Sequence, residues 1–582
     1  MKILRKLNVL LDKKQKTQMA GLVVLMLVGG VLESFGITMI VPIMQIVLDP
    51  EKTKSNGALS LIYKGLNMQS TAQFACFMML MMILVFVIKN IFLFWMNKAE
   101  LKFVYTNQFA TSRRMMINFM QRPYEYYLNA ETSVIQRNIT SDVNNMYGLI
   151  MSLLQLTSEI IVFACLVSIL LYEDAKMTAL IAGLLILTLF VIKKVIKPVM
   201  KRAGQDNQDF YAGLYKWIDQ SVLGIKEIKI SDTEDYFINE YAKCGAGYVN
   251  AVQKYNLYNA TPRLLIETVC VAGLIGYMMI IMMQGAGVSQ LIPQLTVFAL
   301  AAMRLLPSAN RINNYQTSIA YFEPFFMGVS DNLQHDIHDD RISYDPATYK
   351  KTSQVEKLPV HKEIKLEDIV YKYPNSDELI FDHADMTIPV GQSVGIVGTT
   401  GAGKTTIVDI MLGLLRIDEG KILADGVDVA TDYRGWLKNI GYIPQSIFMI
   451  DTTIRKNVAF GIPDEEIDDE KVWRALGEAQ LDDYVKKLPQ GLDTRIGERG
   501  IRLSGGQRQR IGIARALFED PEVLVLDEAT SALDNDTEAA VMESINRLHT
   551  RKTLIIIAHR LETIEKCDMV YRVDGGKISR DR

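Results

Sequence analysis

The chain has 582 residues, of which 49% are hydrophobic and 22% are charged, with a formal net charge of −3. This balance gives no electrostatic reason to expect a nucleic-acid partner, and five dispersed cysteines argue against a disulfide framework. The composition is uneven, because long apolar runs fill residues 1–330 whereas the rest resembles a water-soluble domain.

Six apolar segments in residues 1–330 reach or approach the roughly 20 residues that a bilayer-spanning helix needs. They cover about 19–48, 71–96, 146–172, 175–196, 262–284 and 291–312. The first is longer than the core of a signal peptide, so we expect it to remain as a spanning helix. An even number of spans puts the basic N-terminus on the same cytosolic side as the soluble half, in agreement with the positive-inside tendency.

The connections between these spans alternate in length. Residues 97–145 and 193–261 are long, charged and poor in proline and glycine, which favours helix pairs projecting into the cytosol. Two helices of about 24 residues would each extend roughly 35 Å. We expect the tips of these pairs near 121–127 and 221–229. On the outer side, 49–70 contains LSLIYKGL, a short amphipathic stretch suited to a membrane surface.

Residues 331–363 show no apolar periodicity, which indicates a linker. A phosphate-binding loop is predicted further along the chain. The sequence SVGIVGTTGAGKTTIVDIML (393–412) predicts a strand, a glycine-rich turn and a helix, the context that the motif G-x-x-x-x-G-K-[ST] requires. Lys404 should reach the β- and γ-phosphates, and Thr405 should ligate Mg²⁺. The ATP-binding residues predicted here are Gly398, Thr399, Thr400, Gly401, Ala402, Gly403, Lys404, Thr405 and Thr406.

Two acids end a predicted buried strand in EVLVLDEATSALD (522–534). Asp527 at the strand end suits an indirect partner of Mg²⁺, and Glu528 is then placed to polarise an attacking water. A dipeptide of acids after an apolar strand is weak evidence alone, but a phosphate loop in the same chain makes it strong.

A second anion-binding helix start lies in RLSGGQRQRIGIARAL (502–517). Because one nucleotide cannot easily use two such helix starts of the same chain, we expect two chains to face each other head to tail. Each phosphate loop would then be covered by the other chain's LSGGQ, through the residues Ser504, Gly506 and Gln507.

These motifs, in this order, resemble the nucleotide-binding domain of the ATP-binding cassette (ABC) family over all of 364–582. The resemblance implies that Tyr373 stacks on adenine and that Gln445 senses Mg²⁺ and the membrane domain. It also implies that His559 contacts the γ-phosphate and that Asp534 bridges two cassettes. The catalytic residues would be Glu528, His559 and Gln445.

Six spans followed by one cassette resemble the half-transporter arrangement of ABC exporters. The fold class expected is a membrane α-helical domain of the type I exporter kind (1–330), joined through the linker to an α/β P-loop cassette. By the same resemblance, the tips of the cytosolic helix pairs are coupling helices. Since every catalytic motif is intact, we expect a homodimer with two equivalent ATP sites.

Four cations lie inside the predicted spans, where a charge is costly and usually marks function or an internal pair. Counted at 1.5 Å per residue from the outer helix ends, Arg304 lies roughly 20 Å deep, and Lys89, Arg263 and Arg311 lie about 27 to 31 Å deep. They could form a belt that binds phosphate or pyrophosphate, which arginine holds in a bidentate fashion. Alternatively they could pair with the acids Glu33, Glu159 and Glu267.

The segments PRLLIE (262–267), RLLPSANRI (304–312) and LESFGITMIVP (32–42) resemble bacterial flippases of lipid-linked oligosaccharides. That resemblance implies a pyrophosphate-binding belt of Lys89, Arg263, Arg304 and Arg311, although the family prefers arginine at the position of Lys89. The function it favours is ATP-driven flipping of a polyprenyl-pyrophosphate-linked oligosaccharide across a bacterial cell membrane.

Two alternatives stay open. The same motor could export another hydrophobic cargo, such as a lipid A-like lipid, a drug or a peptide. From a different class, the cassette of a regulatory membrane protein could gate a channel, although intact Glu528 and His559 argue against this.

Overall fold

The computed structural model describes residues 2–38, 71–173, 175–283, 288–334, 355–528, 551–557 and 564–582, with 543, 545 and 547. The chain forms two compact units. The helical unit consists of Met1–Met120 and Ala130–Asp336, and the sheet unit consists of Gln121–Asn129 and Ile337–Arg582.

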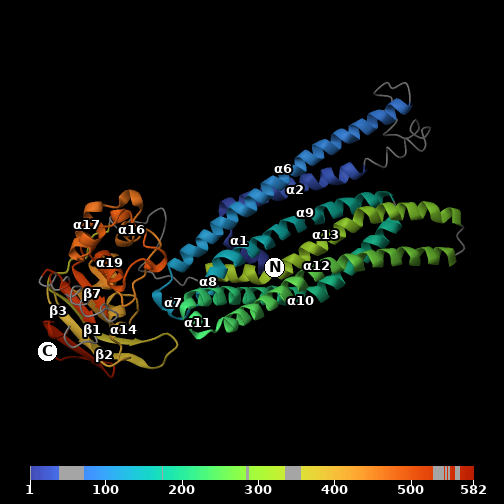
Figure 1. Ribbon diagram of the computed structural model, residues 1–582. Helices are drawn as coiled ribbons and strands as arrows, with labels where there is room; N and C mark the ends of the chain where they lie inside the picture. Colours follow the sequence, from blue (N-terminus) through green and yellow to red (C-terminus); the bar gives the residue numbers. More distant parts are fainter. Residues whose placement is uncertain are drawn as a thin grey trace. The chain divides into compact units, whose positions relative to one another are not determined.

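Long helices build the helical unit (Figure 1). Its elements are α1 (Lys2–Leu10), α2 (Lys13–Thr38), α6 (Thr71–Met120), α8 (Thr132–Arg137), the π-helix η1 (Asn138–Asp142), α9 (Val143–Glu173), α10 (Ala175–Leu223), α11 (Ile225–Ser231), α12 (Glu234–Met283) and α13 (Val288–Gln334). At 1.5 Å per residue, α6, α10, α12 and α13 are each about 70 to 75 Å long, more than twice the thickness of a hydrocarbon core. Each is therefore long enough to hold a predicted span and its extension in one uninterrupted helix.

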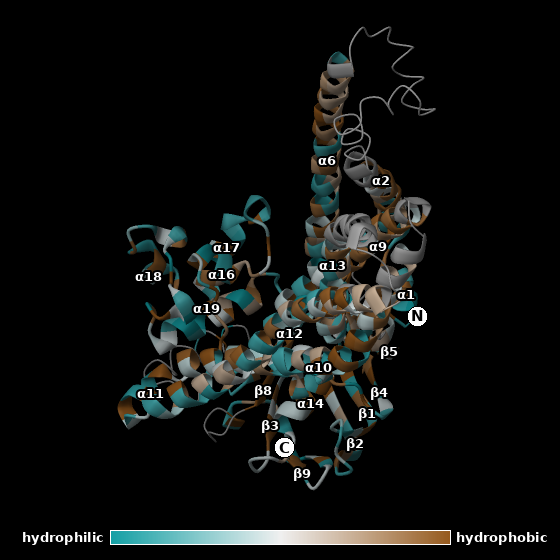
Figure 2. Cartoon of the chain, turned by 90° about the vertical axis from the view of Figure 1, so that its right-hand side faces the viewer, coloured by the Kyte–Doolittle hydropathy of each residue, from teal (hydrophilic) through white to brown (hydrophobic). Residues whose placement is uncertain are grey.

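Apolar side chains cover much of the outside of this unit. Hydrophobic residues recur along the length of α6 in Figure 2, and Leu80, Ile83 and Phe94 on that helix are exposed. Within the described residues, three helical stretches are long and apolar enough to cross a membrane: Lys13–Leu32, Gln73–Met120 and Thr132–Ser168. They contain parts of the first three predicted spans; the side chains of the other three predicted spans are described only in part.

The helices of this unit pack closely through small residues and a buried polar network. A Cβ atom at Gly204 on α10 would lie 2.0 Å from the carbonyl oxygen of Tyr321 on α13, so only glycine permits this approach. Nearby, the buried carboxylate of Asp142 accepts hydrogen bonds from Arg137 Nε at 3.2 Å and from Gln208 Nε2 at 2.7 Å. The bond from Gln208 to Asp142 therefore joins the two helix pairs predicted in 97–145 and 193–261.

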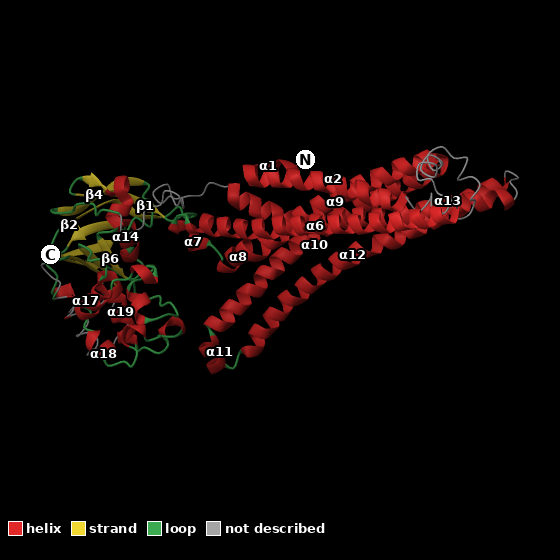
Figure 3. Ribbon diagram, turned by 90° about the horizontal axis from the view of Figure 1, so that it is seen from above, coloured by secondary structure: helices red, strands yellow, loops and turns green. Residues whose placement is uncertain are grey.

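The sheet unit contains α7 (Tyr124–Asn129) and two sheets surrounded by short helices (Figure 3). Its strands are β1 (Glu363–Lys372), β2 (Leu379–Pro389), β3 (Ser393–Val397), β4 (Glu419–Ala424), β5 (Val427–Asp428), β6 (Ile440–Ile443), β7 (Val523–Asp527), β8 (Thr553–Ile557), β9 (Met569–Asp574) and β10 (Lys577–Arg580). Its further α-helices are α14 (Lys404–Met411), α15 (Tyr433–Leu437), α16 (Ile454–Val458), α17 (Asp469–Glu478), α18 (Asp482–Lys486) and α19 (Gly505–Leu517). Short 3-10 turns occupy Val429–Asp432, Asp464–Glu466, Gly491–Asp493 and Glu498–Gly500.

One sheet is antiparallel, in the order β2-β1-β4-β5, and the other runs β10-β9-β3-β8-β7-β6 with parallel pairing from β9 to β6. Strands β7 and β8 are buried along their whole length, which explains their continuous apolar sequences. One buried cluster includes Ile511 and Leu524, and another includes Ile407 and Val525. The parallel sheet is therefore a rigid base for the loops at its carboxyl edge.

The boundaries differ slightly from those expected. Helix α13 continues to Gln334, past the predicted start of the linker at 331, and β1 begins at Glu363, the last predicted linker residue. The stretch LSLIYKGL in 49–70 lies outside the described residues.

Candidate functional site

The predicted nucleotide residues follow strands that end side by side. In the parallel sheet, Ile557 at the end of β8 is in register with both Ile396 on β3 and Asp527 on β7. Ligands of parallel sheets bind outside the carboxyl ends of the strands. The phosphate loop after β3 and the acids at the end of β7 therefore meet at one edge.

The phosphate loop has a backbone that needs glycine. Gly401 and Gly403 have φ values of 84° and 101°, in the left-handed region that side chains rarely adopt. A Cβ atom at Gly403 would also lie 3.1 Å from atoms of Ile380 and of Phe381. Directly after Gly403, α14 begins, so its free N–H groups and dipole face the loop.

Lys404 is buried at the start of α14. Its ammonium donates hydrogen bonds to the carbonyl oxygens of Gly398 at 3.1 Å and Thr399 at 3.0 Å. These bonds curl the loop around the cation. A buried ammonium surrounded by backbone dipoles is suited to anionic phosphate oxygens, so the residues present fit a nucleoside triphosphate.

Asp527 is the buried acid at the end of β7. Burial and the neighbouring Glu528 raise its pKa, whereas hydrogen bonds from Tyr442 and Thr405 act in the opposite direction. The Tyr442 hydroxyl lies 3.4 Å from Asp527 Oδ2. A carboxylate beside the hydroxyl of Thr405 fits Mg²⁺, a hard cation that prefers oxygen ligands.

Gln445 and Glu528 are in direct contact. The amide Nε2 of Gln445 donates to Glu528 Oε2 at 2.7 Å. Glu528 has a φ of 48°, and its backbone N–H donates to the carbonyl oxygen of Ile557 at 3.1 Å. The turn after β7 thus sets the direction of the catalytic candidate, and Gln445 holds its carboxylate.

Tyr373, the predicted adenine-stacking residue, lies next to the phosphate-loop helix. Its hydroxyl is 2.8 Å from Thr406 Oγ1. A cavity of about 520 Å³ lies beside the ring, lined among others by Glu125 of α7 and Arg416. The backbone N–H of Arg416 donates to Glu125 Oε1 at 2.5 Å, so α7, the tip predicted near 121–127, is docked here.

Ser504 is the N-cap of α19. Its hydroxyl accepts from the Gln507 N–H at 3.3 Å, and Gln507 Oε1 accepts from the Ser504 N–H at 2.9 Å, which completes a capping box. Ser504 and Gly505 are exposed. This helix start is therefore pre-organised and open to an anion.

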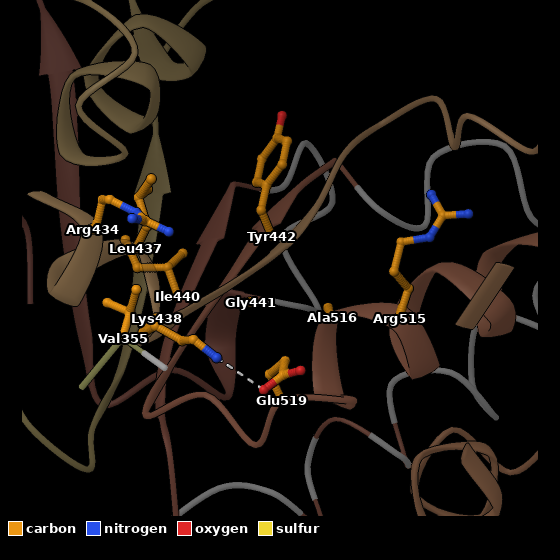
Figure 4. A pocket seen from close by; sticks show the side chains of 10 residues that line it. All are labelled: Val355, Arg434, Leu437, Lys438, Ile440, Gly441, Tyr442, Arg515, Ala516 and Glu519. Atoms are coloured by element: carbon orange, nitrogen blue, oxygen red, sulfur yellow. Dashed lines mark hydrogen bonds and ion pairs between the residues drawn. The ribbon is translucent and has the colours of Figure 1, made fainter. Parts of the chain in front are cut away.

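A hollow of about 400 Å³ lies beside β6, between α15 and the end of α19 (Figure 4). It is lined by Val355, Arg434, Leu437, Lys438, Ile440, Gly441, Tyr442, Arg515, Ala516 and Glu519, and Lys438 pairs with Glu519 at 3.1 Å. Tyr442 is thus shared between this hollow and Asp527.

Arg515 joins this hollow to two exposed aromatic rings. Its guanidinium donates to the carbonyl oxygens of Asn457 and Phe448, both at 2.8 Å, and stacks 4.5 Å from the ring centre of Phe460. Phe448 is 67% exposed and Phe460 is 47% exposed. We call Phe448 and Phe460 the aromatic patch.

Several functional candidates were not found from the sequence. Asp409 on α14 is a second acid near Asp527, and burial followed by the charge of Asp527 raises its pKa to about 6. Tyr442 and Glu125 were missed as well. The signal for Tyr442 was its place in GYIPQ, three residues before Gln445. Glu125 lies in the tip predicted near 121–127, but nothing in that segment singled it out, and Asp409 carries no local pattern that points to the site.

Two predicted residues, His559 and Asp534, lie outside the described residues. Of the predicted belt, the backbone of Arg304 is helical but its side chain is not described.

The other three belt residues differ in their partners. Arg311 Nε forms an ion pair at 2.9 Å with Glu159, which is 7% exposed and also accepts from Ser308 Oγ at 2.5 Å. Lys89 lies 4.6 Å from the ring centre of Phe86. Arg263 is exposed, and the described residues include no ion pair between it and Glu267.

Comparison with known families gives matches over most of the chain. The family profile described as ABC transporter transmembrane region matches residues 4–305, and the one described as ABC transporter matches residues 381–531. The first match alone covers more than half of the 582 residues.

Individual relatives cover most of the chain as well. The heterocyst differentiation ATP-binding protein HepA of Nostoc is 30% identical over 459 residues, which are 78% of this chain and 72% of that protein. The ATP-dependent lipid A-core flippase of Bordetella avium is 28% identical over 473 residues, 80% of this chain and 77% of that one. A bacterial Atm1-family ABC exporter solved with ATP bound has the same fold, with a TM-score of 0.76 and 20% identity over 98% of this chain and 95% of the other.

Proposed function

Because this chain belongs to the ABC transporter family, as an exporter half-transporter, we propose that two copies of it form an ATP-driven flippase for a lipid-linked anionic glycan. An ATPase coupled to transport is the activity of this family arrangement. The identity of the cargo and the homodimer are the proposed parts. The observation that carries the proposal is the contact of Gln445 with Glu528 at the edge that also holds the phosphate loop.

Hydrolysis requires a positioned base next to the phosphate site. We assign this role to Glu528, whose carboxylate would accept a proton from the water that attacks the γ-phosphate. Lys404 would bind the β- and γ-phosphates, and Tyr373 would stack on adenine beside the cavity described above. Thr405 and Gln445, with Asp527 behind them, would hold Mg²⁺, which neutralises phosphate charge when bound. His559 would contact the γ-phosphate.

The second copy is needed because an exposed anion-binding helix start is left over in each chain. The start of α19 is pre-organised by the capping box of Ser504 and Gln507. We propose that Ser504, Gly506 and Gln507 of one copy close over the phosphate loop of the other, and that Asp534 bridges the two. ATP would then be bound between two chains, and hydrolysis would release them.

Motion must pass from the nucleotide to the spans. Glu125 of α7 contacts Arg416 near Tyr373, and this contact supports the proposal that the tip senses the site within its own chain. The tip of the other hairpin, α11, exposes Ile225 and Ile230, at 51% and 75%. We propose that α11 docks on the aromatic patch of the second copy, because both surfaces are exposed and apolar.

The cargo is proposed from the intramembrane cations. Arg311 is compensated by Glu159, which fits the internal-pair alternative for this residue. Lys89 and Arg263 have no ion pair in the described part of the chain. Uncompensated cations inside a span suit a lipid with a phosphate or pyrophosphate group. We therefore propose a polyprenyl-pyrophosphate-linked oligosaccharide, flipped outward across a bacterial inner membrane with the cassette in the cytosol.

The test is flipping by the purified full-length protein in liposomes. A fluorescent polyprenyl-pyrophosphate glycan should become accessible on the opposite leaflet only when Mg²⁺ and ATP are present. Glu528→Gln should abolish the ATP-dependent part, and flipping that survives this change would exclude a hydrolysis-driven mechanism. Lys89→Gln with Arg263→Gln should cripple flipping but leave basal ATPase largely intact.

A second candidate cargo is a lipid A-like lipid, because several relatives are named lipid A-core flippases. Competition separates the two cargoes. If a phosphorylated lipid A precursor blocks the flipping of the glycan lipid and is itself flipped faster, the second candidate replaces the first. Equal flipping of an uncharged lipid would exclude both.

A further inference from the structure

A cavity of about 330 Å³ opens in the helical unit between α9, α10 and α13, beside α1. Leu153, Leu156 and Ile160 line it from α9, and Ile192 and Ile196 line it from α10. Its lining over these two helices is therefore largely apolar. The volume is within the range of pockets that hold small ligands, and the transport cycle proposed above does not use it.

The edge of this cavity is positively charged. Lys193 and Lys197 lie one helical turn apart on α10, and both are exposed. Neither has an ion pair within the part of the chain that the structure describes. The acid in the lining, Glu323, pairs with Lys201 at 3.1 Å, so its charge is already compensated. A ligand with a negative group is favoured at the two lysines.

A buried hydrogen-bond donor lines the same cavity. Asn313 on α13 is 3% exposed, and its amide nitrogen has no hydrogen-bond partner among the residues that the structure describes. A buried donor without a partner costs free energy that an acceptor would recover. This donor is independent of the lysines, and it indicates a ligand with an oxygen acceptor next to its apolar part.

The cavity lies where the helices change from apolar to polar. The span predicted in α10 ends at about 196, beside Lys193 and Lys197, and the span predicted in α13 ends at about 312, beside Asn313. Helix α1 contributes Ile3 to the lining; it buries Leu7 and exposes Leu4 among basic residues. A basic amphipathic helix of this kind lies in the plane of a membrane interface. The cavity is thus at the level of the cytosolic headgroups.

We propose that this cavity binds an anionic glycerophospholipid of the cytosolic leaflet, with its phosphate at Lys193 and Lys197. One acyl chain would lie along the apolar side chains of α9 and α10, and Asn313 would donate to an ester or phosphate oxygen. Basic pockets between membrane helices on the cytosolic side recognise anionic headgroups in this way. The site goes beyond the proposed transport, because it needs neither nucleotide nor cargo.

The proposed cargo shares the chemistry of an anion on a hydrocarbon chain, but it suits the cavity less well. A space of about 330 Å³ accommodates a phosphate and the first part of one chain, and the Asn313 donor suits the ester oxygens of a glycerophospholipid, which a polyprenyl chain lacks. The occupant to which we commit is therefore a resident phospholipid, with phosphatidylglycerol as the probe.

The experiment is native mass spectrometry of the full-length protein released from nanodiscs that contain equal amounts of phosphatidylglycerol and phosphatidylcholine with identical acyl chains. Wild type should retain phosphatidylglycerol preferentially. Lys193→Gln with Lys197→Gln should weaken retention by about 10- to 30-fold, from the usual contribution of a basic residue near an anionic surface. Lys194→Gln with Lys216→Gln removes two exposed charges from the same helix outside the cavity and should have no effect.

Two further variants keep the result interpretable if the glutamine variant folds poorly. Lys193→Arg with Lys197→Arg keeps the charge and should retain the lipid, whereas Asn313→Leu should lower retention by about fivefold through the lost donor. The measurement is made without nucleotide and repeated with Glu528→Gln, so a failure of transport does not affect it. Equal retention of both lipids, or equal losses in the glutamine pair and its control, would overturn the proposal. So would preferential retention of a polyprenyl pyrophosphate in nanodiscs to which that lipid is added.

Discussion

The side-chain amide of Gln445 donates a hydrogen bond to the carboxylate of Glu528 at 2.7 Å. The two residues follow β6 and β7, neighbouring parallel strands in which Ile443 is in register with Leu526. The contact is therefore a consequence of sheet register. It places the residue that reports on the membrane domain, by family resemblance, against the residue proposed to activate water.

Replacing Glu528 should stop hydrolysis without stopping binding. Glu528→Gln keeps the shape and the hydrogen bond but cannot accept a proton, so we expect ATPase activity to fall by about 100-fold or more. Gln445→Leu removes both the hydrogen bond that orients Glu528 and a proposed ligand of Mg²⁺, so we expect ATPase activity to fall by about tenfold or more. Phosphate release from the purified protein measures both. Near-normal activity of Glu528→Gln would mean that another group is the base.

Replacing Lys404 should stop binding itself. Lys404→Met removes a buried ammonium that is held by the carbonyl oxygens of Gly398 and Thr399. Loss of charge-assisted bonds to two phosphates should weaken ATP affinity by about 100-fold. Calorimetric titration of ATP measures this, with Lys421→Met, an exposed lysine on β4, as the control. Unchanged affinity would show that the cation does not contact the nucleotide.

The local structure around the candidate nucleotide site was largely predictable because its determinants are local. The glycines between β3 and α14, the acids at the end of β7 and the N-cap Ser504 lie within short segments whose patterns fix their own conformation. Their convergence also follows from a general rule, since parallel strands present their carboxyl ends at one edge. The contact of Gln445 with Glu528 could not be derived in this way, because it depends on which strands are neighbours.

The partners of the belt residues were less predictable, because the depth of a residue along a helix does not say which neighbouring helix its side chain faces. Residue counting placed Arg311 inside the bilayer, but could not decide which of the three candidate acids it meets. The structure pairs Arg311 on α13 with Glu159 on α9, whereas Glu267, one turn from Arg263, has no such pair in the described residues. The partner of Arg311 is 152 residues away in the sequence and was chosen by helix packing.

The pair of Arg311 and Glu159 should be visible in a double-mutant cycle. Arg311→Gln removes the cationic partner of a buried carboxylate, which keeps its hydrogen bond from Ser308, and should cost about 1 to 3 kcal/mol of unfolding free energy. Glu159→Gln should cost less, because the Arg311 side chain is 45% exposed. The double variant should be less destabilised than the sum by about 1 to 3 kcal/mol. Denaturant unfolding in detergent gives the three values. Two results together would instead assign Arg311 to the cargo: the stability losses of the two single variants add up fully in the double variant, and only Arg311→Gln loses cargo-stimulated ATPase activity.

Acid should weaken the ion pair of Asp520 and Lys552 in the sheet unit. The hydrogen bond from Lys552, 2.6 Å long, lowers the pKa of Asp520 below its ordinary value of 3.8. A lowered carboxyl pKa stabilises the fold above about pH 4, and this contribution is lost as pH falls through the lower, folded value. Asp520→Asn tolerates the same left-handed backbone, with φ of 52°.

We therefore expect Asp520→Asn to lower stability at pH 7 by about 1 kcal/mol, a small value because the carboxylate is largely exposed. The difference from wild type should shrink as the pH falls below about 4 and through the lowered pKa of Asp520. Thermal unfolding across this range measures it, and Glu565→Gln, which removes an exposed acid, is the control. A difference that stays constant with pH would show that the charge of Asp520 is irrelevant.

Phe460 of the aromatic patch should couple hydrolysis to transport. The ring stacks on Arg515, which is itself held by the carbonyl oxygens of Phe448 and Asn457, so its exposed face is rigid. If α11 of the second copy docks there, Phe460→Ala should leave ATP binding unchanged but reduce flipping per ATP hydrolysed by about tenfold. The reason is that about 1.4 kcal/mol of apolar contact would be lost. Ile230→Ala on α11 should have the same effect, and the double variant should be no worse than either single change. Parallel assays of phosphate release and flipping in liposomes give the ratio. Additive losses would place Ile230 and Phe460 in separate interactions, and the proposed docking of α11 would then be wrong.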